Sequence, residues 1–357
     1  MSVFAKCAAL REYVYGGPRR ATMKRSYHAE GRASAPSMRI VSGLQPSGPL
    51  HLGNYFGTIR PAIALQTHGE GFYFIADLHA LTTVRDPAAL RRYSRDVALD
   101  LLAAGLDPAR AVLFRQSDVP AVTELAWILS TVTPLGLLER AHAFKDRVAR
   151  GIPASHALFS YPVLMAADVL LYGADIVPVG RDQTQHVEIA RDIATKFNAG
   201  YGSVLTLPRA SILAEVAIVP GVDGQKMSKS YGNTIALGLS GDALRKRVMA
   251  IVTDSASVAE PKDPARSTIV ALYRLVASAE EIRRMEDEFR TGGVGYGEFK
   301  RRLFEALETY FVGFRDRRAA LGQEPAAVDR LLEAGADRAR AVAAETMTHV
   351  RQATGIV

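Results

Sequence analysis

The sequence predicts an α/β protein in which a doubly wound parallel sheet is followed by an all-helical domain. Two observations support this fold class. Short apolar runs with strand character alternate with helical patterns from Met38 to about residue 235, and such alternation is typical of parallel sheets covered by helices. After Asn233 the strand signals nearly vanish and long amphipathic helical patterns replace them. The chain has 357 residues, of which 48% are hydrophobic, so it is long enough for two domains.

The strands and helices can be placed in order along the chain. Each predicted strand is a short apolar run followed by a loop and then by a helical pattern. The predicted strands cover residues 39–43, 71–76, 111–114 and 175–179. The predicted helices begin at about residue 51 and then cover 87–104, much of 120–172, 181–197, 242–252, 266–278, 297–320 and 325–353. Ligands of such sheets bind at the carboxyl ends of the strands, and the polar motifs of this sequence fall there.

Residues 1–37 form a basic segment with seven basic and two acidic side chains and no long apolar period. We expect a poorly ordered extension ahead of a domain that begins near Met38. Three interpretations stay open: a tail that binds a nucleic acid or a protein partner, a transit peptide, or a stretch that precedes the true start at Met38. The extension carries most of the formal net charge of +7.

Composition excludes several classes of protein. The single cysteine, Cys7, cannot form an intramolecular disulfide or a cysteine-built metal site, so we predict a reducing, cytoplasmic location. The apolar run 163–179 is interrupted by Asp168 and Asp175. It is therefore shorter than the roughly 20 apolar residues that a membrane span requires, and we expect no membrane contact.

The segment 224–233 has the composition of a phosphate-binding loop. Lys226 and Lys229 are three residues apart, close enough to reach neighbouring oxygens of one polyphosphate. Ser228 and Ser230 add hydroxyl donors, and glycines at both ends let the loop close and reopen. A solvated basic loop would explain a lone pair of lysines, so the prediction depends on a second phosphate-binding element.

That second element is the segment 45–54. A predicted strand ends in a Pro/Gly loop, and the helix that follows points its positive N-terminal end toward bound phosphates. His51 and Asn54 lie on one face of the first turn. Gly53 leaves room between them for an adenine ring or a ribose to approach the backbone. Neither a P-loop nor the glycine motif of dinucleotide-binding folds is present.

With both elements, the sequence resembles the bacterial tryptophanyl-tRNA synthetases, a family of class I enzymes. The segment His51-Leu52-Gly53-Asn54 matches the HIGH-type signature of that family, and Lys226-Met227-Ser228-Lys229-Ser230 matches its KMSKS signature. The resemblance implies a Rossmann-like catalytic domain with a helical insertion at residues 38–235. It also implies a helical anticodon-binding domain at residues 236–357.

The resemblance assigns roles to individual residues as well. It implies that His51, Lys226 and Lys229 are catalytic. It implies that ATP is bound by Gln45, Pro46, Ser47, Gly48, Gly53, Asn54, Gly180, Arg181, Asp182, Lys226, Met227, Ser228, Lys229 and Ser230. Arg181 departs from the acidic residue that is more common at this position in the family. We expect Mg²⁺ to arrive with ATP and no protein metal site, since the phosphate motifs contain no carboxylate cluster.

The amino-acid substrate is indicated by residues 159–172. Tyr161, Met165 and Asp168 are spaced so that they share one helix face. An aspartate in an apolar helix requires a donor, and an indole N–H is one, although an arginine with a structural role would serve equally. The resemblance favours the indole. It also implies a tryptophan pocket formed by Val41, His79, Tyr161, Met165, Asp168, Val177, Val179 and Gln183. For His79, the alternative of a buried core histidine stays open.

The predicted reaction requires no general acid or base from the protein, because the substrate carboxylate is already a nucleophile. The work is to align it with the α-phosphorus and to compensate charge on the phosphates. The resemblance implies a ligase whose partners are ATP, L-tryptophan, tRNA(Trp) and a second copy in a homodimer, and basic clusters after residue 300 suggest RNA contact. Two alternatives stay open: another nucleotidyl-transferase of the same fold, and a synthetase paralogue with an interaction or regulatory role.

Val41 occupies a strand position at which many members of the family carry Phe. In those relatives the ring lies against the indole, so a valine leaves extra room unless a neighbour fills it. We therefore predict tolerance of ring-substituted tryptophans.

Overall fold

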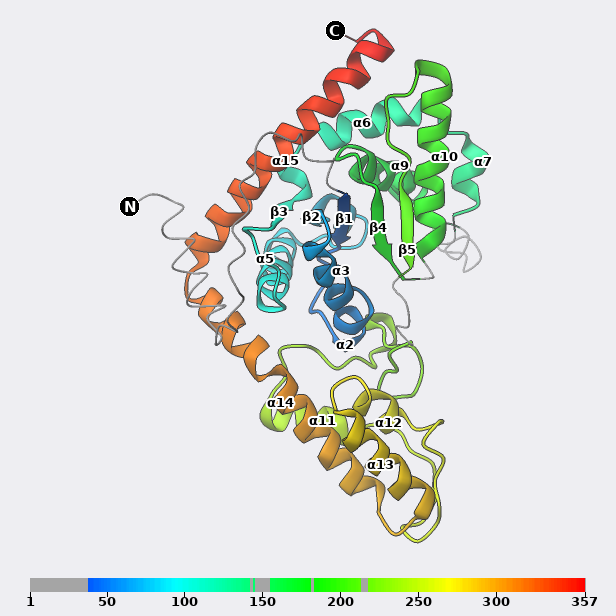
Figure 1. Ribbon diagram of the computed structural model, residues 1–357, viewed down its shortest axis with the longest axis vertical. Coiled ribbons are helices and arrows are strands. Elements are labelled where there is room, and N and C mark those ends of the chain that lie inside the picture. The colour runs from blue at the N-terminus through cyan, green and yellow to red at the C-terminus, as the bar shows by residue number, and fades with distance from the viewer. Residues whose placement is uncertain (1–37, 142–143, 145–154, 181–182, 213–217, 357) are drawn as a thin grey trace, which may run out of the picture.

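The computed structural model describes residues 38–141, 144, 155–180, 183–212 and 218–356, and it confirms the predicted parallel sheet (Figure 1). Within these residues the sheet has five strands in the order β3-β2-β1-β4-β5. Their bounds are β1 Arg39–Leu44, β2 Glu70–Ile75, β3 Ala111–Arg115, β4 Ile176–Val179 and β5 Arg209–Ile212. The sequence reading missed β5, because its four residues include an arginine and a serine and form no apolar run.

The central strand β1 sets the position of the site. It pairs in parallel with β2 along its whole length and with β4 through Ile40 and Ile176. The chain moves outward from β1 to β3 and then returns to β4 on the other side of β1. The strand order therefore reverses between β1 and β4, and the carboxyl ends at such a switch point form the ligand crevice of an open parallel sheet.

Helices cover both faces of the sheet and continue beyond it. They are α2 Leu52–Asn54, α3 Arg60–Ala64, α4 Asp77–Ala80, α5 Pro87–Ala103, α6 Ala121–Ser130, α7 Leu135–Glu139, α9 His156–Leu170, α10 Thr184–Tyr201, α11 Gly241–Met249, α12 Thr268–Tyr273, α13 Ala279–Thr291, α14 Tyr296–Gly322 and α15 Pro325–Thr354. A π-helical turn, Tyr55–Ile59, joins α2 to α3. The helical stretch predicted across 120–172 is divided into α6, α7 and α9.

Side chains of successive strand residues point to opposite faces, so each strand contributes to two cores. On β2, Tyr73 packs in one cluster with apolar residues of α3, α5 and α14. Phe72 and Phe74 pack in the other cluster with residues of α6, α9 and α10. The stacked rings of Phe72 and Tyr172, 5.1 Å apart, extend this second core to the end of α9. The switch point lies between these two layers.

The last helix returns to the sheet. In Figure 1, α11, α12 and α13 form a lobe with α14 beyond the sheet, whereas α15 runs back along the side of β3. The approach to β3 is close, since a Cβ atom on Gly335 would lie 1.9 Å from the carbonyl oxygen of Leu113. Only glycine fits there. The division into domains at residue 235 stays a prediction, but α15 packs with the sheet.

Most of the basic clusters of the C-terminal helices are compensated within the chain. Acidic side chains or backbone carbonyls accept from these arginines, so the argument for RNA contact from clustered charge loses its support. The ion pairs join Arg301 to Glu298 and Glu305, Arg302 to Glu288, Arg315 to Glu308, Arg318 to Asp96 and Asp100, and Arg340 to Asp337.

Candidate active site

The segment after β1 is tied to the strand-like segment that follows the 224–233 loop. The backbone N–H of Leu52 donates to the carbonyl of Ile235 at 3.0 Å, and that of Leu237 donates to Leu50 at 3.0 Å. These two bonds enclose His51, which forms an isolated antiparallel bridge with Ala236. Motifs that lie far apart in the sequence are therefore adjacent, as the sequence reading required.

The turn around Gly53 explains the need for glycine. A Cβ atom there would lie 3.0 Å from the ring of His51 and 3.4 Å from Cβ of Met227. The Gly53 N–H lies 3.4 Å from the Met227 sulfur. The loop 224–233, which carries both lysines, therefore packs directly on this turn. Asn54 closes the turn by accepting from the His51 N–H at 3.1 Å. The structure thus places His51, Gly53 and Asn54 together with Met227.

Asn233 organises the loop 224–233, a role that the sequence reading did not assign. It is 2% exposed, and its amide donates to Asp223 at 2.8 Å and to the Lys226 carbonyl at 3.1 Å. Its amide oxygen accepts from the Ser228 N–H at 2.8 Å. Gly232 adopts a φ of 64° beside it, which favours glycine. The signal available in the sequence was an asparagine directly after a glycine at the end of the polar motif.

Lys229 reaches across to the first phosphate element. Its ammonium donates to the Gly48 carbonyl at 2.9 Å and lies 3.4 Å from the Ser47 hydroxyl. Lys226, in contrast, is exposed in an antiparallel bridge with Pro220. Ser228 and Ser230 share a hydrogen bond of 2.9 Å between their hydroxyls. Of the predicted lysines, the structure brings Lys229 to the loop after β1.

Burial shifts the protonation of two side chains at this point. Desolvation and, to a smaller extent, the nearby Lys229 charge together lower the pKa of His51 to about 4. His51 is therefore neutral at pH 7. Its Nδ1 is buried and has no hydrogen-bond partner among the described residues. Desolvation also lowers the pKa of Lys229.

Asp168 of α9 lies at the centre of a buried hydrogen-bond network. It is 2% exposed. His79 Nε2 lies 2.8 Å from its Oδ2, and Gln116 Nε2 donates to Oδ1 at 2.7 Å and to Oδ2 at 2.9 Å. Its hydrogen-bond partners in the structure are therefore an imidazole and an amide, where the alternative interpretation had an arginine. Burial raises the pKa of Asp168, and the hydrogen bonds from His79 and Gln116 act against this rise.

Gln116 was missed by the sequence reading. It follows β3 directly, is 1% exposed, and its amide oxygen accepts from the backbone N–H groups of Leu78 and His79 at 3.1 and 3.4 Å. The signal was its position, since a polar residue at the carboxyl end of a parallel strand is a candidate ligand residue. Gln45 lies close to the same network, because its amide donates to the His79 carbonyl at 3.3 Å.

A second hydrogen-bonded chain starts from Tyr161. Its hydroxyl lies 2.6 Å from His186 Nε2, and His186 Nδ1 lies 2.6 Å from the side-chain oxygen of Gln183. An amide oxygen only accepts, so Nδ1 carries a proton. Tyr161 and Met165 are both half-buried on α9, on the helix that carries Asp168. His186 was not predicted.

The predicted valines occupy different depths. Val41 is 1% exposed and belongs to the core cluster that also contains Val177, which is 8% exposed. Val179 is half-buried at the end of β4. The ring of Phe74 lies above β1, since a Cβ atom on Gly43 would be 2.3 Å from it. An aromatic ring from β2 therefore lies beside the position at which the family often carries Phe.

Other predicted residues complete the site. Pro46 and Gly48 are buried in the loop after β1, whereas Gly180 is half-buried directly after β4. Arg181 and Asp182 lie outside the described residues. Within the described ranges no three His, Cys, Asp or Glu side chains are grouped so that they could bind a metal ion. None of the helices in the described part of the chain has the length and apolar character to cross a membrane.

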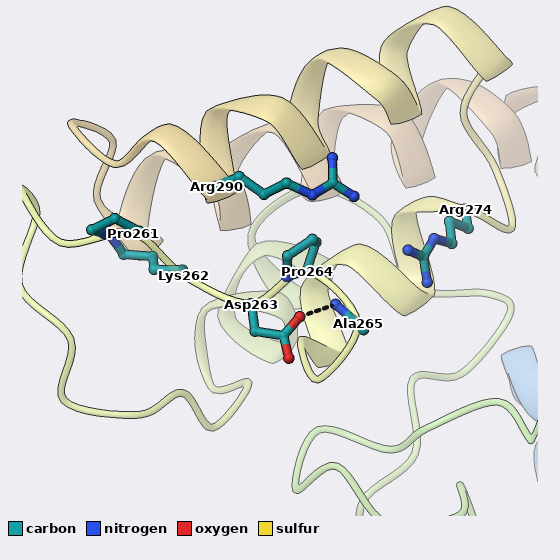
Figure 2. A pocket seen from close by; sticks show the side chains of 7 residues that line it. All are labelled: Pro261, Lys262, Asp263, Pro264, Ala265, Arg274 and Arg290. Atoms are coloured by element: carbon teal, nitrogen blue, oxygen red, sulfur yellow. Dashed lines mark hydrogen bonds between the residues drawn. The ribbon is translucent and has the colours of Figure 1, made fainter.

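A separate open pocket of about 430 Å³ lies in the helical lobe (Figure 2). Its lining consists of Pro261, Lys262, Asp263, Pro264, Ala265, Arg274 and Arg290. Both arginines pair with Glu286, at 2.6 and 2.9 Å. Lys262 donates to the carbonyls of Ser257 and Glu260 at 2.9 and 2.8 Å. The cations are compensated and no predicted site residue is present, so this pocket is not the candidate active site.

Comparison with known proteins gives consistent matches. A family model described as tRNA synthetases class I (W and Y) matches residues 33–312. A tryptophan–tRNA ligase from Rhodopirellula baltica is 52% identical over 319 residues, which are 89% of this chain and 100% of that protein. A crystal structure of tryptophanyl-tRNA synthetase from Campylobacter jejuni, complexed with ADP and tryptophan, is 47% identical with a TM-score of 0.83 and covers 89% of this chain and 100% of its own. The enzyme from Mycoplasma pneumoniae is 30% identical with a TM-score of 0.77, covering 90% and 98%.

Proposed function

We infer that this chain, which belongs to the class I tRNA synthetases for tryptophan and tyrosine, is a tryptophan–tRNA ligase. The family assignment confirms the resemblance drawn from the two signatures. The observation that carries the choice of substrate is the buried Asp168 carboxylate, which contacts His79 and Gln116 beyond the carboxyl ends of β2 and β3. The reaction is activation of L-tryptophan with ATP to tryptophanyl-adenylate and pyrophosphate, followed by transfer of tryptophan to tRNA(Trp).

Selection of tryptophan follows from hydrogen-bond chemistry. An ionised carboxylate is an acceptor only, and the indole N–H is a donor only. A buried acceptor that loses its partner carries a large desolvation cost, so a substrate without the N–H is disfavoured. Tyr161, Met165 and Gln183 are proposed to contact the rest of the amino acid, since they lie on α9 and at the start of α10 near Asp168.

Catalysis consists of alignment and charge compensation. Lys229 lies at the loop after β1, where an ammonium can stabilise negative charge that grows on the phosphates in the transition state. Neutral His51 is proposed to form a ring hydrogen bond to the substrate and to contribute no charge. Lys226 is proposed to reach the phosphates when the loop closes on them.

ATP brings its own magnesium ion in this proposal. Mg²⁺ keeps most of its ligands as phosphate oxygens and water, so it requires few protein carboxylates. The hydroxyls and backbone groups of Ser47, Gly48 and the loop 224–233 suit contact with phosphate oxygens. The metal supplies additional charge compensation at the phosphates.

The other proposed partners follow from the reaction. We place the enzyme in the cytoplasm with its tRNA and propose that it functions as a homodimer. Trp127 of α6 and Leu135 at the start of α7 support the dimer, because these large apolar side chains are 74% and 67% exposed. Exposed apolar residues at neighbouring helices are typical of a surface that another chain covers.

The test is ATP–pyrophosphate exchange with the full chain across the standard amino acids, followed by charging of tRNA(Trp). We expect exchange that depends on tryptophan and formation of tryptophanyl-tRNA. Exchange with another amino acid in preference to tryptophan would overturn the assignment. Exchange without transfer to tRNA would instead favour an adenylating paralogue with an interaction role.

A further inference from the structure

The side chain of Gln116 makes polar contacts to four atoms of three residues around the proposed tryptophan pocket. Its oxygen accepts from two backbone N–H groups of α4, and its nitrogen donates to both oxygens of Asp168. We infer that Gln116 is a positioning residue that keeps Asp168 an ionised acceptor and so determines discrimination against side chains that lack an indole N–H. This inference rests on the proposed function and adds a specificity residue to it.

The orientation of the Gln116 amide is fixed by its surroundings. The backbone N–H groups of Leu78 and His79 are donors only, so the amide oxygen has to face them, at 3.1 and 3.4 Å. The NH₂ group then faces Asp168. A flipped amide would set two donors against its own NH₂ group and leave the carboxylate facing an oxygen, at a cost of several buried hydrogen bonds.

This orientation selects one protonation state of Asp168. Gln116 donates to Oδ1 and Oδ2, and His79 Nε2 lies 2.8 Å from Oδ2. A proton on either oxygen would face an N–H donor, so the network favours the carboxylate. Burial and the nearby Asp77 charge act in the opposite direction and raise the pKa of Asp168. The hydroxyl of Tyr172 is the other titratable group that interacts with it.

The occupied lone pairs limit which substrate group can bind. A carboxylate offers about four acceptor directions, and Gln116 and His79 use three of them in the structure. The remaining direction can accept one further donor. An indole N–H suits this position, whereas a ring with sulfur in place of N–H leaves a buried acceptor unpaired.

The experiment compares tryptophan with β-(3-benzothienyl)alanine, in which sulfur replaces the indole N–H. The measured quantity is the ratio of kcat/KM for the two substrates in ATP–pyrophosphate exchange. In Gln116→Met we expect the ratio to fall by about tenfold or more, through loss of tryptophan activity, while kcat/KM for the sulfur analogue changes by less than about threefold. In Gln116→Glu the amide donor becomes a carboxylate that shares a proton with Asp168, so the ratio falls as well.

The matched control is Gln66→Met. Gln66 also bridges backbone groups through its amide, with bonds of 3.1 Å to the Gly105 carbonyl and 2.9 Å from the Asp107 N–H, but it lies outside the pocket. We expect Gln66→Met to leave the ratio of kcat/KM for the two substrates unchanged. If kcat/KM falls equally for both substrates in the two Gln116 variants, the ratio is unchanged. Gln116 would then have only a structural role. Absence of tryptophan exchange in the wild type would contradict the proposed function instead.

Discussion

Asp168 and Lys229, two residues of the candidate active site, are held in place differently. Asp168 is 2% exposed and receives three hydrogen bonds from His79 and Gln116, at 2.7 to 2.9 Å. Lys229 is half-buried on a loop, and its ammonium contacts the Gly48 carbonyl and the Ser47 hydroxyl. Asp168 is held by side chains from two other segments of the chain, whereas the ammonium of Lys229 is held by the loop after β1.

The difference matches the two tasks of the enzyme. Discrimination between amino acids requires an acceptor whose direction is set before the substrate arrives. Charge compensation requires a group that exchanges its partner when the phosphates bind and that interacts most strongly in the transition state. Gln45 connects the two regions through its hydrogen bond to the His79 carbonyl. We therefore expect mutations in the pocket to change selectivity and mutations in the loop to change rate.

Lys229→Ala has the largest expected effect. The ammonium stabilises charge mainly in the transition state, so we expect adenylate formation to slow by about 100- to 1000-fold. The dissociation constant for tryptophan should change by less than about threefold, since Lys229 does not contact that pocket. Rapid-quench measurement of adenylate and equilibrium binding of tryptophan check the two parts. Lys196→Ala, at an exposed position on α10, is the control. If Lys229→Ala weakened tryptophan binding as much as it slowed adenylate formation, the functional contrast between the pocket and the loop would be contradicted.

Asp168→Asn has the second largest expected effect. An asparagine presents one acceptor oxygen, and its NH₂ group has to face a donor of Gln116 or His79. We expect discrimination between tryptophan and phenylalanine, measured as a ratio of kcat/KM, to fall by about 100-fold. Asp100→Asn is a matched control, because Asp100 is also buried but pairs with Arg318 outside the pocket. It should lower stability and leave the ratio unchanged. Unaltered discrimination in Asp168→Asn would remove Asp168 from substrate recognition.

Val41→Phe sharpens the prediction of tolerance toward ring-substituted tryptophans. Val41 is 1% exposed, and the Phe74 ring lies near it on the same face of the sheet. A phenylalanine overpacks this region, at a cost on the order of 1–3 kcal/mol, and reduces the room above β1. We expect the ratio of kcat/KM for tryptophan to that for a substituted analogue to rise by about tenfold. An unchanged ratio in a folded variant would show that Phe74 already fills the space.

Deletion of residues 1–37 has the smallest expected effect. The described motifs all follow Met38, so we expect tryptophan activation to change by less than about twofold. Charging of tRNA at raised salt tests the tail interpretation, because a basic segment that contacts RNA gives salt-dependent binding. A folded, truncated protein without exchange activity would place the extension in the site.

The sequence predicted the fold and both phosphate elements because these depend on local patterns. Strand and helix alternation identified β1 to β4, and glycine and lysine spacing identified the loops. β5 was missed since Arg209–Ile212 lacks an apolar run and is a strand only through its pairing with β4. Likewise, nothing local indicates that α15 returns to β3, because close packing at Gly335 is visible only in three dimensions.

The partners of site residues that act through long-range hydrogen bonds could not be predicted from the sequence. Gln116 lies 52 positions from Asp168 and His186 lies 25 from Tyr161, so no spacing rule connects them. The lowered pKa of His51 depends on burial and on the Lys229 charge, and Lys229 lies far along the chain, so the sequence alone gives no sign of it. Residue types and motif spacing predict which groups are present, whereas the fold decides their partners and charge.

The most direct test of the division between pocket and loop is a double-mutant cycle of Asp168→Asn and Lys229→Ala. Single-turnover adenylate formation is measured at subsaturating tryptophan in the wild type, both single variants and the double variant. If the two regions act independently, the fractional losses multiply within about threefold. A double variant that loses no more activity than Lys229→Ala alone would contradict the account, because selection and charge compensation would then be one coupled function.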